Sequence, residues 1–201
     1  MVGFFDPNEN RAEIIRRLKG TNRPGIDELI AAMDEGGFFE SPCSGGYHLC
    51  EKGGLAEHTL NVCDFAIKVA EALVPEKLDE LRESITIAAL LHDLGKMGDF
   101  SKCGYVPNLL KSGKPSASKP FKVNKDLLNV PHSIRSVKIA SQYIKLSEDE
   151  EYAILMHDGM YGDLKYAVQG NETLLYFIIH TADFYSARFF EVDGNGGDAE
   201  E

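Results

Sequence analysis

Residues 84–96, with the sequence SITIAALLHDLGK, place an adjacent histidine and aspartate at the end of an apolar run. The run is apolar almost all round, which is the pattern of a helix buried at the centre of a protein. An imidazole and a carboxylate are costly to bury unless they are paired, hydrogen-bonded or bound to metal. Neighbouring side chains on a helix leave about 100° apart, so His92 and Asp93 can both reach one cavity. The pair therefore predicts a buried polar site, and its donor atoms suit a transition metal.

Helical periodicity also dominates the rest of the chain, and runs that alternate like strands are scarce. Ser147 and Glu150 have the spacing of a capping box, which predicts the start of a helix. Two irregular connections are expected, at 38–54 and at 101–131, because both are rich in residues that favour loops. The sequence predicts an all-α helical bundle with helices near 8–19, 26–34, 55–73, 84–96, 132–144, 148–157 and 172–190.

Length and composition favour one soluble globular domain of 201 residues. We expect an N-terminal helical cap at 1–37, a main domain at 38–190 and an acidic disordered tail at 191–201. The net charge is −11, and the last eleven residues hold five acids, which leaves about −6 on the rest of the chain. This negative charge argues against extensive electrostatic binding of nucleic acid. No apolar run is long enough to span a membrane, and the start lacks the pattern of a secretory signal. The expected location is the cytoplasm, with Cys43, Cys50, Cys63 and Cys103 as thiols rather than a structural zinc site.

Further polar residues interrupt predicted helices in a fixed order along the chain. GGLAEHTLNV contains His58, LLHDLGK contains His92 and Asp93, and HTADFYSAR contains Asp183. Together these segments resemble the H…HD…D signature of HD-domain phosphohydrolases. The segment from VPHSIRS to MHDGMYGD adds His132 and His157, and is similar to the two-histidine insertion of binuclear members. The resemblance covers about residues 38–190 and extends to stand-alone HD proteins and to the HD domain of bacterial 3′-to-5′ exoribonucleases, whose N-terminal nucleic-acid-binding module has no counterpart here.

The resemblance implies a centre of two divalent transition-metal ions (Fe, Mn, Co, Ni or Zn) held by His58, His92, Asp93, His132, His157 and Asp183. Asp93 would bridge the ions, and a hydroxide between them would attack phosphorus. Without His132 and His157 as ligands, the enzyme would be mononuclear. Lys96 follows His92 by four residues, and we expect it to stabilise the charge of a bound phosphate.

For several other residues the sequence allows two possible roles. His48 and Arg188 are candidates for substrate binding, or else ordinary loop and surface residues. His180 is expected to support the site rather than to bind metal, and Asp158 would orient His157 or cap a turn. The long connection carries lysines without neighbouring acids, which would attract phosphate or lie in a solvated loop; these are Lys111, Lys114, Lys119, Lys122 and Lys125.

The expected function is hydrolysis of a phosphomonoester or phosphodiester bond in a nucleotide or a short oligonucleotide. The segment GMYG at 159–162 differs from the GYP motif of cyclic-dinucleotide phosphodiesterases, which disfavours that subfamily. Two alternatives stay open, because a fold and a ligand set do not fix a reaction. One is an HD-fold di-iron oxygenase with a similar ligand set, and the other is a non-catalytic nucleotide sensor. The substrate, the physiological metal and the oligomeric state are left open by the sequence.

Overall fold

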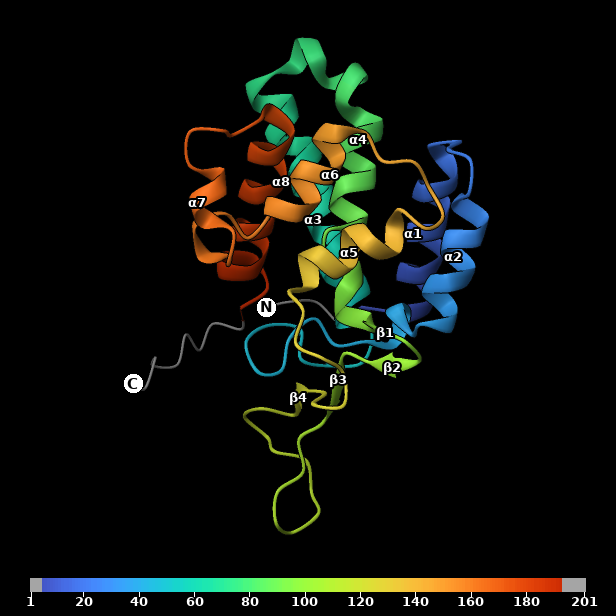
Figure 1. The fold of residues 1–201 in the computed structure, drawn as a ribbon, viewed down its shortest axis with the longest axis vertical. Helices are drawn as coiled ribbons and strands as arrows, with labels where there is room; N and C mark the ends of the chain where they lie inside the picture. Colours follow the sequence, from blue (N-terminus) through green and yellow to red (C-terminus); the bar gives the residue numbers. More distant parts are fainter. Residues whose placement is uncertain (1–4, 193–201) are drawn as a thin grey trace.

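The computed structural model describes residues 5–192 and confirms a mostly helical fold (Figure 1). The helices in this part of the chain are α1 (Pro7–Gly20), α2 (Ile26–Glu35), α3 (Gly54–Leu73), α4 (Leu78–Leu91), α5 (His132–Ala140), α6 (Glu148–Met156), α7 (Lys165–Val168) and α8 (Leu174–Tyr185). Short 3-10 turns are η1 (Phe38–Glu40), η2 (Pro75–Lys77), η3 (Leu94–Met97) and η4 (Gly159–Tyr161), and the π-helical turn η5 (Ser186–Phe190) extends α8. The capping box of α6 is confirmed.

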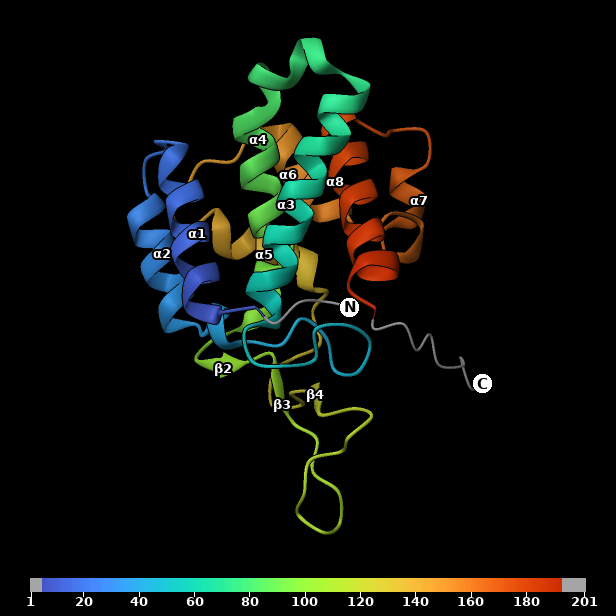
Figure 2. The ribbon, with the colours of Figure 1, turned by 180° about the vertical axis from the view of Figure 1, so that it is seen from behind.

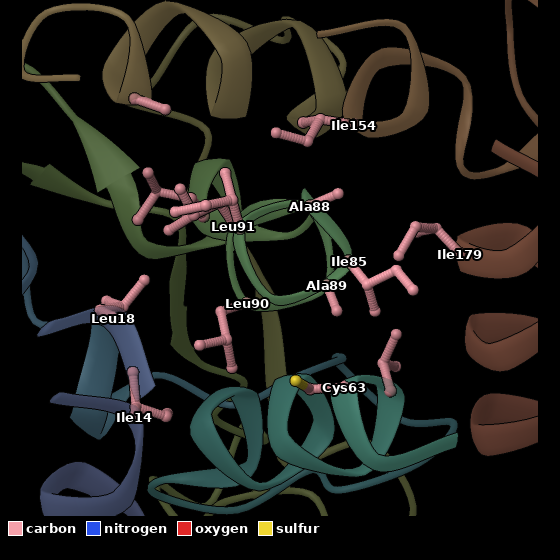
Figure 3. Packing of buried hydrophobic residues seen from close by; sticks show 14 of the residues in the cluster. Ile14, Leu18, Cys63, Ile85, Ala88, Ala89, Leu90, Leu91, Ile154 and Ile179 are labelled. Atoms are coloured by element: carbon pink, nitrogen blue, oxygen red, sulfur yellow. The ribbon is translucent and has the colours of Figure 1, made fainter. Parts of the chain in front are cut away.

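Helix α4 lies at the centre of the bundle, as its apolar sequence predicts. It packs against α1, α3, α6 and α8, and Figure 3 shows its side chains surrounded by residues of those helices. Ile85, Ile87, Leu90 and Leu91 are fully buried, and each such side chain stabilises the fold by roughly 1.5–3 kcal/mol. This packing fixes the end of α4, where the His-Asp pair lies.

The end of α4 differs from the helix predicted through residue 96. The α-helix ends at Leu91, His92 is its C-cap, and Asp93 has a φ of −103° and a ψ of 9°, outside the helical range. The chain then turns through η3, in which the Lys96 amide donates to the Asp93 carbonyl at 2.9 Å. Lys96 therefore does not lie one α-helical turn beyond His92, and its side chain lies beside Asp93 instead.

The connection at 101–131 is more regular than predicted. Strands β1 (Gly98–Asp99) and β2 (Lys102–Cys103) form one antiparallel pair, and β3 (Tyr105–Pro107) and β4 (Phe121–Val123) form another, with Val106 opposite Lys122. The distal part of the second hairpin extends away from the helices in both views (Figures 1 and 2). These strands are too short to show an alternating pattern, which is why the sequence indicates only a loop.

The N-terminal helices belong to the same hydrophobic core as α4. Ile14 and Leu18 of α1 and Leu29 and Met33 of α2 are fully buried in that core. Glycine is required at Gly25, which has a φ of +88°, because a Cβ there would lie 1.9 Å from the carbonyl oxygen of Tyr143. The helices predicted as a cap at 1–37 are thus packed directly against the main bundle.

An ion pair ties this N-terminal segment to α6. Both guanidinium nitrogens of Arg23 lie against the Glu150 carboxylate, at 2.6 and 2.9 Å, and the Glu150 side chain is fully buried. Burial raises the pKa of Glu150, but hydrogen bonds from Arg23, the Ser147 amide and Ser84 outweigh this effect and lower it. Removal of Arg23 would leave a buried carboxylate without its cation.

We expect Arg23→Met to lower the free energy of unfolding at pH 7 by about 3 kcal/mol, because the unpaired charge stays buried. The matched control is Arg11→Met, whose pair with Asp34 is exposed and is worth at most about 1 kcal/mol. Urea denaturation measures both. The pKa of Glu150 is lowered in the folded state, so its ionised carboxylate stabilises the fold. This stabilisation is present above the ordinary pKa of 4.5 and is lost as the pH falls below that value. The difference in the free energy of unfolding between wild type and Arg23→Met should therefore become smaller in acid. Equal free energies of unfolding for wild type and both variants at pH 7 would contradict the expectation.

Candidate metal centre

Five helices, α3, α4, α5, α6 and α8, bring all six predicted ligands together in one cluster. His58 lies near the start of α3, His92 and Asp93 follow α4, His132 begins α5, His157 is the C-cap of α6, and Asp183 lies in α8. Four of these side chains are at most 1% exposed, whereas His132 and Asp183 are 29% and 17% exposed. The cluster is therefore buried on one side and open on the other.

The first group of ligand atoms surrounds one oxygen of Asp93. The Nε2 atom of His58 lies 3.1 Å from Asp183 Oδ1 and 3.3 Å from His92 Nε2. Both histidine Nε2 atoms are 3.5 Å from Asp93 Oδ2. These four residues are those of the H…HD…D signature.

The second group surrounds the other oxygen of the same carboxylate. The Nε2 atoms of His132 and His157 are 3.1 Å apart and lie 3.1 and 3.6 Å from Asp93 Oδ1. Asp93 thus presents one oxygen to each group. This arrangement is the one that a bridging carboxylate requires.

Hydrogen bonding tests whether these residues fit a metal ion. The Nδ1 atoms of His92 and His157 lie 2.7 and 2.8 Å from the carbonyl oxygens of Ala89 and Ile154. A carbonyl only accepts, so each Nδ1 carries a proton, and the Nε2 atom of each ring is the one that faces the cluster. Ring nitrogens that converge in this way suit a cation between them.

Asp93 supports the same conclusion. Both of its carboxylate oxygens are buried and accept no hydrogen bond of acceptable geometry within residues 5–192, although Lys96 Nζ lies 2.6 Å from Oδ2. Buried carboxylates without donors are costly. Burial also lowers the pKa of His92 to about 4 despite the nearby Asp93 carboxylate. His92 is therefore neutral at neutral pH, as a metal ligand must be.

Glu191 is a part of the site that the sequence did not reveal. It was assigned to the acidic tail at 191–201, of which residues 193–201 lie outside the described part of the chain. In the structure Glu191 is buried, and its carboxylate accepts from His58 Nδ1 at 2.9 Å, from His48 Nδ1 at 2.6 Å and from Asn61 Nδ2 at 3.0 Å. The contact with His58 leaves the Nε2 atom of that ring to face the cluster.

His48 and Lys96 place positive charge beside the cluster. Burial lowers the pKa of His48, but Cys43 and Glu191 outweigh this effect and raise it to about 9. Cys43 Sγ lies 3.8 Å from His48 Nε2 and 3.9 Å from Lys96 Nζ. All four cysteines are free, as predicted.

Asp158 and His180 lie next to the second group of ligands. The carboxylate oxygens of Asp158 lie 3.6 Å from His132 Nε2 and 3.7 Å from His157 Nε2, so it lies close to both rings and does not merely cap a turn. His180 Nδ1 is 2.7 Å from the His157 carbonyl oxygen, which agrees with its expected supporting position. Gly159 has a φ of +56°, and a Cβ there would lie 2.5 Å from the His180 ring. Only glycine allows this approach.

Two pockets open from the ligand cluster. The smaller, of about 130 Å³, is lined by three of the predicted ligands, Asp93, His157 and Asp183, and by His48, Lys96, Tyr161 and Arg188. The larger, of about 400 Å³, begins at His132 and shares Lys96, Asp158 and Tyr161 with the smaller one. His48 and Arg188 thus both lie beside the ligand cluster. None of the five lysines of the long connection is among the residues that line either pocket.

Comparison with known proteins agrees with this geometry. Residues 55–188 match the HD domain family. The chain therefore belongs to that family, and the resemblance drawn from its motifs is confirmed. A dihydroneopterin 2′,3′-cyclic phosphate phosphodiesterase of Methanocaldococcus jannaschii is 35% identical over 91 residues, which are 44% of this chain and 34% of the archaeal protein.

The chain thus spans about a third of the length of that curated relative. No solved structure gives a significant match. Within the described residues, no helix has the length and apolarity needed to cross a membrane.

We expect Glu191→Gln to weaken the binding of Mn²⁺ by about 10–100-fold, since the amide replaces the carboxylate that orients His58. Glu40→Gln serves as the control, because the ion pair of Glu40 in the described part of the chain is with the exposed Lys52 on the surface. Titration of each purified protein with Mn²⁺ against a competing chelator gives the affinity. Equal affinity of Glu191→Gln and wild type would show that the contact does not support the ligand.

Proposed function

We propose that this protein hydrolyses a phosphomonoester or phosphodiester bond in a nucleotide or a similar small molecule, with two divalent metal ions as cofactors. One observation carries the proposal: the buried Asp93 carboxylate lies between two groups of converging ligand atoms and, within residues 5–192, accepts no hydrogen bond of acceptable geometry. The name of the archaeal relative, a phosphodiesterase for a cyclic phosphate, supports a phosphoester as the substrate class.

The ligands fall into two sets that share Asp93. His58, His92 and Asp183 would hold one ion with it, and His132 and His157 would hold the other. Such ions activate water and neutralise charge on a phosphate as the nucleophile attacks. Because His132 and Asp183 are the more exposed ligands, the substrate would approach from their side.

Lys96 and His48 would bind the negative charge of the substrate. The Lys96 side chain is 16% exposed and lines both pockets. Burial lowers its pKa, but the nearby Asp93 outweighs that effect and raises it well above the ordinary value. Lys96 therefore stays charged at neutral pH and is held in place by an anion on its other side, an arrangement suited to stabilising charge on phosphate.

Metal analysis together with a substrate panel tests the proposal. We expect about two ions per chain after loading with Mn²⁺ or Fe²⁺, and release of phosphate or nucleoside from a nucleotide panel without oxygen. Asp93→Ala should abolish turnover and lower the metal content, whereas Asp27→Ala, which changes an exposed surface pair, should do neither. Full activity of Asp93→Ala, or consumption of oxygen by a two-iron protein without hydrolysis, would refute the proposal.

A second variant separates charge stabilisation from metal binding. Lys96→Met should lower kcat by about 100-fold, the loss typical of one electrostatic donor, while the metal content stays near that of wild type. Steady-state kinetics and metal analysis on the same preparation measure the two effects. An unchanged kcat would exclude Lys96 from the reaction, and loss of the metal would assign it to the assembly of the centre instead.

A further inference from the structure

The larger pocket has a different chemical character from the metal cluster that it adjoins. Its outer wall comes from β3, from the segment before α5, from η4 and from α7. Most of the side chains there are aromatic, aliphatic or uncharged amides, and they include Tyr105, Asn124, Met156, Tyr161, Leu164 and Val168. A pocket of about 400 Å³ falls within the range that holds small organic ligands.

Positive charge is scarce in the larger pocket. The two basic residues in its lining are Lys96, which lies at the metal cluster, and Arg135. Arg135 is 4% exposed, with Nη1 at 3.1 Å from Asp99 Oδ2 and Nη2 at 3.0 Å from the Leu128 carbonyl oxygen. Its guanidinium is thus already engaged by protein acceptors.

Negative charge, by contrast, is present in this wall. Asp158 and Asp163 both line the larger pocket, the first beside His132. Asp158 lines both pockets, whereas Asp163 lines only the larger one. A second phosphate group in the outer wall would meet the Asp163 carboxylate, and like charges repel. The Lys96 ammonium in the same lining is paired with Asp93 at the ligand cluster. Arg188 lines only the small pocket at the ligand cluster, and Lys96 lies where the two pockets adjoin and lines both.

From this division we infer that the enzyme is selective for esters that carry a single phosphate. The phosphate lies at the metal cluster in the small pocket, and the larger pocket receives an uncharged organic group of about the size of a nucleoside. Nucleoside diphosphates, triphosphates and esters with further phosphates are excluded. This inference rests on the proposed function and narrows its substrate class.

The first test compares one nucleoside in several forms on the Mn²⁺-loaded protein. kcat/KM is measured for adenosine 5′-monophosphate, 2′,3′-cyclic monophosphate, diphosphate and triphosphate. We expect at least one of the single-phosphate esters to exceed the triphosphate by roughly tenfold or more, because like-charge contacts penalise the wrong ligand. Equal or faster hydrolysis of the triphosphate would overturn the inference while leaving the proposed function intact.

Calorimetric binding of the mono- and triphosphate to the same protein provides a readout without turnover. If none of the four compounds is hydrolysed, the proposed function fails for nucleotides, and the binding preference alone decides the inference. Tighter binding of the monophosphate supports it. Equal binding, tighter binding of the triphosphate, or no binding of either compound overturns it.

A charge reversal in the wall of the larger pocket tests whether repulsion causes the preference for a single phosphate. Asp163 is exposed at the mouth of the larger pocket, so Asp163→Lys adds a cation there with little effect on folding. The ratio of monophosphate to triphosphate in kcat/KM, or in binding affinity, should fall by roughly fivefold, since the repulsion becomes attraction. Glu76→Lys changes the net charge equally at an exposed position of η2 that lines neither pocket, and should leave the ratio unchanged. Equal effects of the two variants would overturn the assignment of the pocket.

Discussion

A carboxylate buried among imidazoles organises this protein. Asp93 is 1% exposed and has histidine nitrogens near both of its oxygens. Such a group is strongly unfavourable in a protein interior unless a cation balances it. The surrounding helices supply the rigidity that keeps the ligands in place, and the Lys96 ammonium, 2.6 Å from Oδ2, balances part of the charge. Stability and chemistry therefore depend on the same few residues.

The position of the site follows from where helices end. The core of the bundle stabilises α4, and its last turn delivers His92 and Asp93 where the α-helical geometry ceases. Gly95 then allows α5 to approach closely, because a Cβ at this residue would lie 2.2 Å from the carbonyl oxygen of His132. The glycine of the HDLGK segment thus brings the second group of ligands to the first. A helix that continued through residue 96 would direct these side chains elsewhere.

Much of the fold and of the candidate site could be predicted from the sequence, because polar residues in apolar helices are conspicuous. His58, His92 and Asp183 stand out in this way, and the structure brings them together. Glu191 could not be found so easily, because it lies among acids and glycines that resemble a solvated tail, and only its spatial neighbours make it special. The turn after Leu91 was missed for a related reason. Periodicity indicates which residues are buried, but not where a helix gives way to a tighter turn.

The contact between Glu191 and His58 joins residues that are 133 positions apart. Protein synthesis proceeds from the N-terminus, so α3 and α4 emerge from the ribosome well before Asp183 and Glu191 do. During that interval the growing chain exposes His58, His92 and Asp93 without the partners that complete their surroundings. The surroundings of the ligands are therefore complete only once residue 191 has been synthesised, and a nascent or truncated chain that stops earlier would offer a looser site to whichever ion is most abundant.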